Sequence, residues 1–318
     1  MPARCRIAVL FGGASKEAAV SEVSATGVAT ALANLGHDVT RVPADRHLAR
    51  RLGELAPEVV FPALHGPPGE DGTVQGLLEM MELPYVGSGV EASAFAMNKI
   101  IAKHAFRMAH LPVADEVVVR ADTSDIHQAA AHIDAILGSQ VAVKPNRQGS
   151  ALGVTLVRNA NELPAALILA LSFGGDVLIE KFITGREVTV AVLDLHGSTA
   201  CALPVIEIRT ATSTWYDYEH RYTAGASEHL IPAPIPENVA QQLASIAIRA
   251  HIALGCRDLS RADFVLSDAM SPVLLEVNTL PGMTPTSLFP DAAHAVGISF
   301  ENLMQQLIDS ALARAAHQ

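Results

Sequence analysis

The stretch 260-SRADFVLSDAMSPVLLEVN-278 decides the fold, because two apolar runs flank one short polar turn. If residues 268–271 form that turn, the runs pair as an antiparallel hairpin with Asp263 opposite Glu276 and Arg261 opposite Asn278. Side chains two positions apart share a face of a strand, so all four groups would lie together.

Two carboxylates that face each other across strands repel, unless a cation lies between them. An oxygen-only ligand set of one or two carboxylates is typical of Mg²⁺, which completes its shell with water and phosphate oxygens. An ordinary exposed face with charges is the alternative for Asp263 or Glu276 alone. The four groups together favour a metal and phosphate site.

The whole chain has 318 residues, of which 50% are hydrophobic, and this predicts a globular protein of two or three domains. The net charge of -11 disfavours nucleic-acid binding. No apolar stretch reaches about 18 residues, and the N-terminus begins as a strand, so we expect a cytoplasmic protein without membrane contact. The three cysteines have no spacing typical of a disulfide framework or a zinc site.

The first 98 residues alternate short apolar strands with helical patterns, which is typical of a parallel βαβ sheet. Strands are expected at 6–11, 38–43 and 57–64, and helices at 15–35 and 73–81. Glycine-rich turns follow two of these strands, at the carboxyl ends where ligands gather in such sheets.

The rest of the chain predicts strands around 140–145, 176–183, 186–194 and 202–208, followed by a polar loop from 210 to 236. That loop is long for a compact domain, and such loops are often lids. A helix from about 240 to 254, the hairpin and a C-terminal helix complete the chain.

Lys144 ends an apolar strand and precedes the loop 146-NRQGSALG-153. A lysine beside glycine amides can hold phosphate oxygens, although a plain hairpin loop explains the pattern equally well. Neither GxxxxGK[ST] nor a GxGxxG after the first strand is present. Their absence argues against the commonest nucleotide folds, including an NAD-dependent dehydrogenase.

Several single carboxylates and one histidine are further candidates, each with a plain alternative. Glu180 and Lys181 point to opposite faces of one strand, and Glu187 enters an apolar strand where an ionised group needs a partner. Glu17 could simply lie near a helix N-terminus, where the helix dipole favours a carboxylate. His65 could cap a turn.

Six motifs in order along the chain resemble the D-alanine:D-alanine ligases of the ATP-grasp superfamily. They are VLFGGASKEAAVS at 9–21, ALHGPPGEDGTVQG at 63–76, AVKPNRQGSALGV at 142–154, LIEKFITGREVTVAVL at 178–193, GCRDLSRADF at 255–264 and LLEVNTLPGMTPTSLFP at 274–290. The resemblance covers nearly the whole chain.

The resemblance implies an α/β fold of the ATP-grasp type, in which ATP lies between two antiparallel sheets. It implies three domains: a parallel Rossmann-like domain at 1–98, a central domain at 99–185 and a catalytic domain at 186–318 with the lid loop. The implied reaction joins two D-alanines through a D-alanyl phosphate in a bacterial, cytoplasmic homodimer that makes peptidoglycan precursor. ATP and two Mg²⁺ ions, or Mn²⁺ in their place, would be the cofactors.

The resemblance also assigns roles to residues. The nucleotide would contact Lys99, Lys144, Glu180, Lys181, Phe182, Ile183 and Glu187, and the metal would contact Asp263, Glu276 and Asn278. Glu17 and His65 would bind the first D-alanine, Arg261 and the amide of Gly282 the oxyanion, and Ser287 and Leu288 the second D-alanine. Ser150 and Tyr222 would link to Glu17 and close the lid.

The sequence departs from the family pattern at Ala18, Ala19, Asn98, Ala151 and Arg221. Arg221 adjoins Tyr222 in the lid, and arginine is not equivalent to lysine there. D-serine or another small amino acid as second substrate therefore remains an alternative. A nucleotide-binding homologue without catalysis is a further alternative, disfavoured because Lys144, Arg261, Asp263 and Glu276 are all present.

Overall fold

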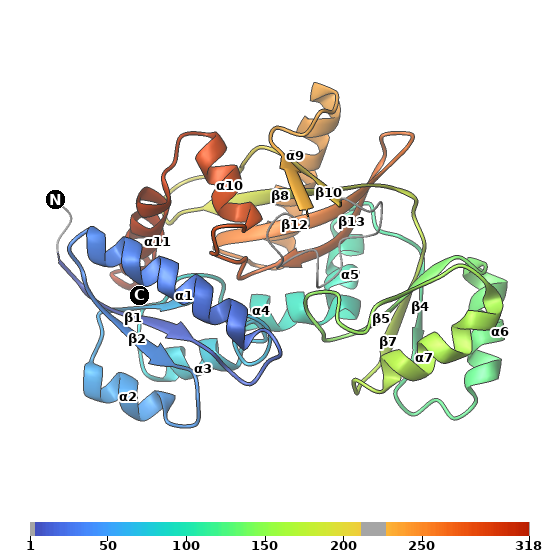
Figure 1. Cartoon of the computed structure of the whole chain (residues 1–318), viewed down its shortest axis with the longest axis horizontal. Coiled ribbons are helices and arrows are strands. Elements are labelled where there is room, and N and C mark those ends of the chain that lie inside the picture. Colours follow the sequence, from blue (N-terminus) through green and yellow to red (C-terminus); the bar gives the residue numbers. More distant parts are fainter. Residues whose placement is uncertain (1–3, 211–226, 318) are drawn as a thin grey trace.

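The computed structural model describes residues 4–210 and 227–317, which form three β-sheets with helices packed on them (Figure 1). The N-terminal sheet has the parallel order β2-β1-β3. Its elements are β1 (Arg6–Phe11), α1 (Ala18–Asn34), β2 (Asp38–Pro43), α2 (Leu48–Leu55), β3 (Val59–Pro62) and α3 (Thr73–Met80). This confirms the βαβ order that the sequence predicts.

Both faces of the N-terminal sheet are buried because its strands are apolar at successive positions. Ile7 and Val9 pack against α1 and against the C-terminal helix α11 (Phe300–Ala315), whereas Ala8 and Leu10 pack against α2 and α3. The C-terminal helices α11 and α10 (Leu288–Ala295) therefore share one core with the start of the chain.

The central sheet is antiparallel in the order β4-β7-β5-β6 and has a core of its own. One face is covered by α6 (Ile126–Leu137) and α7 (Leu163–Leu171), and the whole unit stands apart at the right of Figure 1. Its strands and short helix are β4 (Glu116–Val119), β5 (Val141–Pro145), β6 (Thr155–Val157), η1 (Ala160–Glu162) and β7 (Val177–Lys181).

The C-terminal sheet is antiparallel in the order β11-β10-β8-β12-β13, with β9 paired to β8. One face packs on α9 (Glu237–Ala253) and on α4 (Val90–Met97) and α5 (Lys99–Met108). Its strands are β8 (Gly185–Asp194), β9 (Cys201–Ala202), β10 (Ile206–Thr210), β11 (Ser227–Leu230), β12 (Asp258–Ser267) and β13 (Pro272–Asn278).

The prediction of a loop from 210 to 236 is partly wrong, because residues 227–230 form β11 and pair with β10. This strand is too short and too polar to give a strand pattern in the sequence. The remaining part of the predicted lid, residues 211–226, lies outside the described residues and includes Arg221 and Tyr222.

The hairpin β12–β13 pairs Asp263 with Glu276 and Arg261 with Asn278, as predicted. The turn was predicted wrongly: Leu266, not Ser267, lies opposite Pro272, and a β-bulge at Leu275 restores the predicted register at the polar end. The bulge has a physical consequence. It turns both Leu275 and Glu276 away from the core, whereas strict alternation from buried Leu274 would bury Glu276.

Candidate active site

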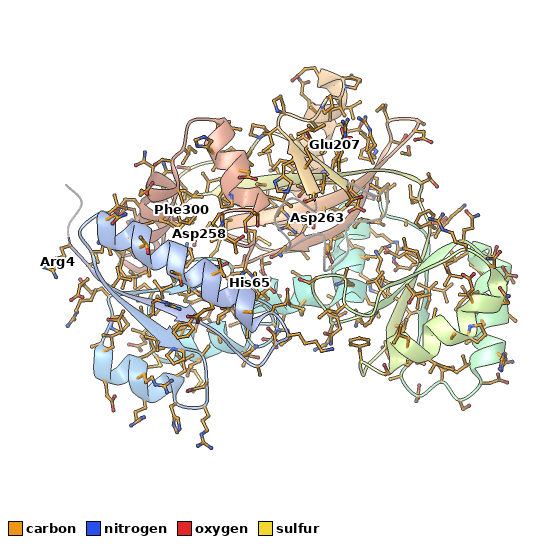
Figure 2. The ribbon with its side chains drawn as sticks, in the orientation of Figure 1. Arg4, His65, Glu207, Asp258, Asp263 and Phe300 are labelled. Atoms are coloured by element: carbon orange, nitrogen blue, oxygen red, sulfur yellow. The ribbon has the colours of Figure 1, made fainter. Side chains whose placement is uncertain are left out.

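Two cavities meet at the middle of the molecule. The larger, of about 960 Å³, lies between the central and C-terminal sheets, and the smaller lies between the N-terminal and C-terminal parts. Both are lined by Lys99, Gln148 and Glu276. In Figure 2, His65 is labelled beside the N-terminal unit and Asp263 on the C-terminal sheet, both near the middle of the molecule. A molecule in the first cavity can therefore meet a molecule in the second at these three residues.

The shared residues are held together by the start of α5 and the loop after β5. Lys99 Nζ lies 3.2 Å from Glu276 Oε2 and donates to the carbonyl oxygen of Gln148 at 2.8 Å. Asn98 caps α5 by accepting from the amide of Ile101, and this fixes the direction of the helix. The junction thus has a lysine and a carboxylate ready to face the reacting groups.

Asp263 is held by three donors. Its two oxygens accept from Arg261 Nε and Nη2, both at 2.8 Å, and Oδ1 also accepts from Thr189 Oγ1 at 2.6 Å. The opposed carboxylates Asp263 and Glu276 are therefore neutralised by Arg261 and Lys99, two cations that anionic ligands can also engage.

The donor set fits Mg²⁺. Asp263, Glu276 and Asn278 offer only oxygen ligands on the accessible face, and Asn278 Oδ1 already accepts from the amide of Leu280 at 2.9 Å. Within residues 4–210 and 227–317, no cluster of three or more His, Cys, Asp or Glu side chains could hold a metal ion. An ion here would have two carboxylates and would need oxygens from a phosphate or water.

Lys144 and Glu180 form an ion pair inside the larger cavity. Burial alone would lower the pKa of Lys144, but the Glu180 carboxylate, with Glu276 and Glu187, raises it above the ordinary value. Burial raises the pKa of Glu180, but Lys144 and Lys103 hold it below the usual range. Both groups are therefore charged at neutral pH.

The remaining residues predicted to hold a nucleotide also line the larger cavity: Lys181, Phe182, Ile183 and Glu187. The guanidinium carbon of Arg158 lies 4.4 Å from the centre of the Phe182 ring, so the two side chains stack at the cavity wall. The backbone amides of Lys181 and Phe182 donate to Asp115 and Gln140, which fixes this segment.

In the smaller cavity, Ser150 Oγ donates to Glu17 Oε1, joining the central part of the chain to the N-terminal part. The contact depends on glycine, because a Cβ at Gly66 would lie 2.8 Å from Glu17 Oε2. Gly66 also has a φ of +65°, which side-chain-bearing residues rarely adopt. The predicted link between Ser150 and Glu17 is present.

His65 is buried beside the same cavity and bonds to Ser24 Oγ through Nε2 at 3.0 Å. Burial, together with the positive charge of Arg261, lowers the pKa of His65 to about 4. The imidazole is therefore neutral at physiological pH and can offer one N–H and one lone pair.

Gly282, Ser287 and Leu288 lie together where the smaller cavity meets the N-terminus of α10. A Cβ at Gly282 would approach Ser287 Oγ to 2.7 Å, so glycine is required for this close approach. Ser287 precedes α10 without capping it, and its Oγ instead bonds to Thr284. An uncapped helix N-terminus favours a carboxylate.

Sequence reasoning missed two residues that line the cavities, Gln148 and Glu70, and one behind them, Lys103, which bonds to Glu180. Lys103 could have been found, because it lies in the apolar stripe of α5 with Ala102 and Phe106. Gln148 lies in a loop and leaves no periodic signal. Burial, with the nearby Glu17 charge, raises the pKa of Glu70 to about 8, so this acid keeps its proton.

The family models "D-ala D-ala ligase N-terminus" and "D-ala D-ala ligase C-terminus" match residues 44–88 and 105–309. A D-alanine--D-alanine ligase of Desulforamulus reducens is 45% identical, with 96% of this chain and 98% of that protein covered. One of Gloeobacter violaceus is 46% identical, with 96% and 99% covered.

Solved structures agree. The D-alanine--D-alanine ligase of Bacillus anthracis complexed with ATP matches with a TM-score of 0.83 at 30% identity, covering 98% of this chain and 99% of that one. D-alanyl-alanine synthetase A of Vibrio cholerae matches with a TM-score of 0.86 at 28% identity, covering 98% and 100%. The mixed α/β architecture with its two antiparallel sheets is the expected ATP-grasp fold. The chain belongs to the D-alanine--D-alanine ligase family.

Proposed function

We propose that this protein joins two D-alanine molecules to D-alanyl-D-alanine, with ATP converted to ADP and phosphate, and so supplies a precursor of peptidoglycan. The observation that supports this most is the junction of the two cavities at Lys99, Gln148 and Glu276. A reaction that moves a phosphoryl group from a nucleotide to a small acid needs such a meeting point.

The nucleotide would occupy the larger cavity, with its phosphates at Lys99 and Lys144 and its base and ribose near Glu180, Glu187 and the segment 181–183. Asp263, Glu276 and Asn278 would hold two Mg²⁺ ions, for which Mn²⁺ can substitute. Bound there, the metal neutralises the charge that develops on the phosphate oxygens. Catalysis would then rest mainly on position and charge.

The first D-alanine would occupy the smaller cavity with its ammonium group at Glu17 and its carboxylate near His65. A carboxylate oxygen forms a bond to the γ-phosphorus as the bond from that phosphorus to the ADP oxygen breaks, which gives D-alanyl phosphate. Because His65 is neutral, it orients the carboxylate without withdrawing its negative charge.

The second D-alanine would place its carboxylate at Ser287 and Leu288, at the N-terminus of α10. Its neutral amine attacks the acyl carbon, phosphate leaves with the electron pair of the broken C–O bond, and the proton that the nitrogen loses goes to the phosphate. Arg261 and the amide of Gly282 would stabilise the oxyanion formed in this step. Tyr222, outside the described residues, would join Ser150 and Glu17 in closing the lid against water.

The proposal also includes three domains divided at residues 98 and 185. It includes assembly of the chain as a homodimer in the cytoplasm. Within the described residues, no helix is long and apolar enough to cross a membrane.

The test is ADP release from ATP and Mg²⁺ with D-alanine as the only amino acid, together with identification of the dipeptide. We expect ADP and D-alanyl-D-alanine in equal amounts. Release of ADP only when D-serine or another amino acid is added would favour the alternative second substrate. Nucleotide binding without ADP release under any of these conditions would favour a non-catalytic homologue.

A further inference from the structure

Lys103 is almost completely buried, which is unusual for a lysine: its side chain is 1% exposed. Its Nζ donates to the carbonyl oxygen of Ala114 at 3.1 Å and to Glu180 Oε1. It also lies 2.9 Å from Glu116 Oε2, close enough for an ion pair although the angles are not those of a hydrogen bond. Two hydrogen bonds and one ion pair therefore surround the ammonium group with oxygen atoms.

The two carboxylates lie directly opposite each other on neighbouring strands, since β4 pairs Glu116 with Glu180 on β7. Lys144 shares this face of the sheet, because Ala142, two residues earlier, lies opposite Glu180 on β5. The other face of the sheet is the apolar core. Lys103 reaches the polar face from α5 and separates two acids that would otherwise repel.

The charges of this cluster balance without Lys144. Arg107 pairs with Glu116, so Lys103 and Arg107 supply two positive charges against the two carboxylates. Lys144 is the fifth charge and pairs with the remaining oxygen of Glu180. If Lys144 moves to a phosphate, Glu180 keeps a cation, and no unpaired buried charge is left behind.

We propose that Lys103 is a positioning residue of the nucleotide site: it holds Glu180 in place and so leaves Lys144 available for the phosphates. This inference rests on the proposed function, in which Lys144 binds ATP. Without Lys103, Glu180 would have Lys144 as its nearest cation and would compete with the nucleotide for it.

The test is the Kd of Mg²⁺-ADP, measured by calorimetry on the full chain. We expect Lys103→Met to raise the Kd about 30-fold or more, the size expected when one partner of a buried charge pair is removed. The control is Arg120→Met, which breaks an ion pair with Asp176 on the surface of the same unit, where Arg120 is 73% exposed. It should change the Kd less than about twofold, and a similarly small change in Lys103→Met would overturn the proposal.

The double variant Lys103→Met/Glu180→Gln separates positioning from mere support of the fold. Neutral Gln releases Lys144 but also removes the charged Glu180 from the nucleotide cavity, so Glu180→Gln alone is the reference. If Lys103 acts through Glu180, replacing it has no further effect once Glu180 is neutral, and the Kd of the double variant should lie within about twofold of that of Glu180→Gln. A further rise of about tenfold or more in the double variant would mean that Lys103 acts other than by holding Glu180, and would overturn the proposal.

If Lys103→Met does not fold, Lys103→Gln replaces it with the same expected results, since its amide can still donate to the Ala114 carbonyl oxygen.

Failure of this proposal can be distinguished from failure of the proposed function. A wild-type chain that binds ADP but forms no dipeptide would refute the ligase and leave the binding test valid. A wild-type chain that does not bind ADP would refute both.

Discussion

The pair Asp263 and Glu276 on the C-terminal sheet has the same backbone relation as the pair Glu116 and Glu180 on the central sheet: each joins acids directly opposite on antiparallel strands. The first pair lines the cavities and is 14% and 31% exposed. The second is 7% and 3% exposed and encloses a lysine of the chain itself. The open face leaves the first pair accessible to the exchangeable cation of the proposed function, whereas the second pair encloses a permanent one.

A third pair of neighbouring acids, Glu17 and Glu70, differs from both. Both are buried in the smaller cavity, and burial with the Glu17 charge raises the pKa of Glu70 to about 8. Here a proton removes the repulsion. Three acid pairs are thus relieved in three ways: by Arg261 and Lys99 at an open face, by an enclosed lysine and by a proton.

The largest expected effect is on the free energy of unfolding, where one variant in each of the two opposed pairs can be compared. Glu180→Gln should lower the free energy of unfolding by about 3–5 kcal/mol, because Lys103 and Lys144 lose a buried partner. Glu276→Gln should lower it by less than about 1 kcal/mol, since that carboxylate is partly solvated. Urea unfolding measures both, and equal losses would remove the distinction between a permanent and an open site.

Glu276→Gln should instead affect catalysis. We expect ADP release with D-alanine to fall by about 100-fold or more, with a higher Mg²⁺ requirement, because a charged ligand at the cavity junction is lost. Glu54→Gln, an exposed acid on α2 that pairs with Arg50, is the control. Turnover equal to that of the wild type would refute the metal assignment.

The proton on Glu70 predicts a pH dependence. The folded protein keeps this proton up to about pH 8, whereas an ordinary glutamic acid releases it near pH 4.5. The folded state thus binds more protons between these values, and stability falls as the pH rises through them. Glu70→Gln removes this loss, so its Tm relative to wild type should rise from pH 5 to pH 8. A constant difference would show that Glu70 is ionised throughout.

The smallest effect is expected at Thr189, whose hydroxyl donates to Asp263 at 2.6 Å. Thr189→Val keeps the volume and removes this bond, so the Mg²⁺ requirement of ADP release should rise about tenfold at most. Stability should change little, because Asp263 retains both bonds to Arg261. A loss as large as that of Glu276→Gln would mean that Thr189 contacts the ion itself.

The sequence predicts the order of strands and helices because apolar periodicity is a local property. It also predicts that Asp263 faces Glu276, although the bulge at Leu275 that makes this register possible has no signal in the alternation. The roles of single residues, such as Glu17 or Ser287, came from the family resemblance.

The partners of Lys103 were beyond the sequence for a different reason. Glu180 is 77 residues away along the chain, and only the packing of α5 against the central sheet brings the two together. The proton on Glu70 likewise depends on burial and on Glu17, 53 positions earlier in the numbering, and no local pattern encodes either.

The most direct test of the account is Mn²⁺ binding in the presence of ADP, followed by electron paramagnetic resonance. The open pair should bind Mn²⁺ in the wild type and in Arg120→Met, and Glu276→Gln should lose at least one ion per chain. Retention of every Mn²⁺ ion by Glu276→Gln would contradict the claim that the Asp263 and Glu276 pair is the exchangeable cation site of this ligase.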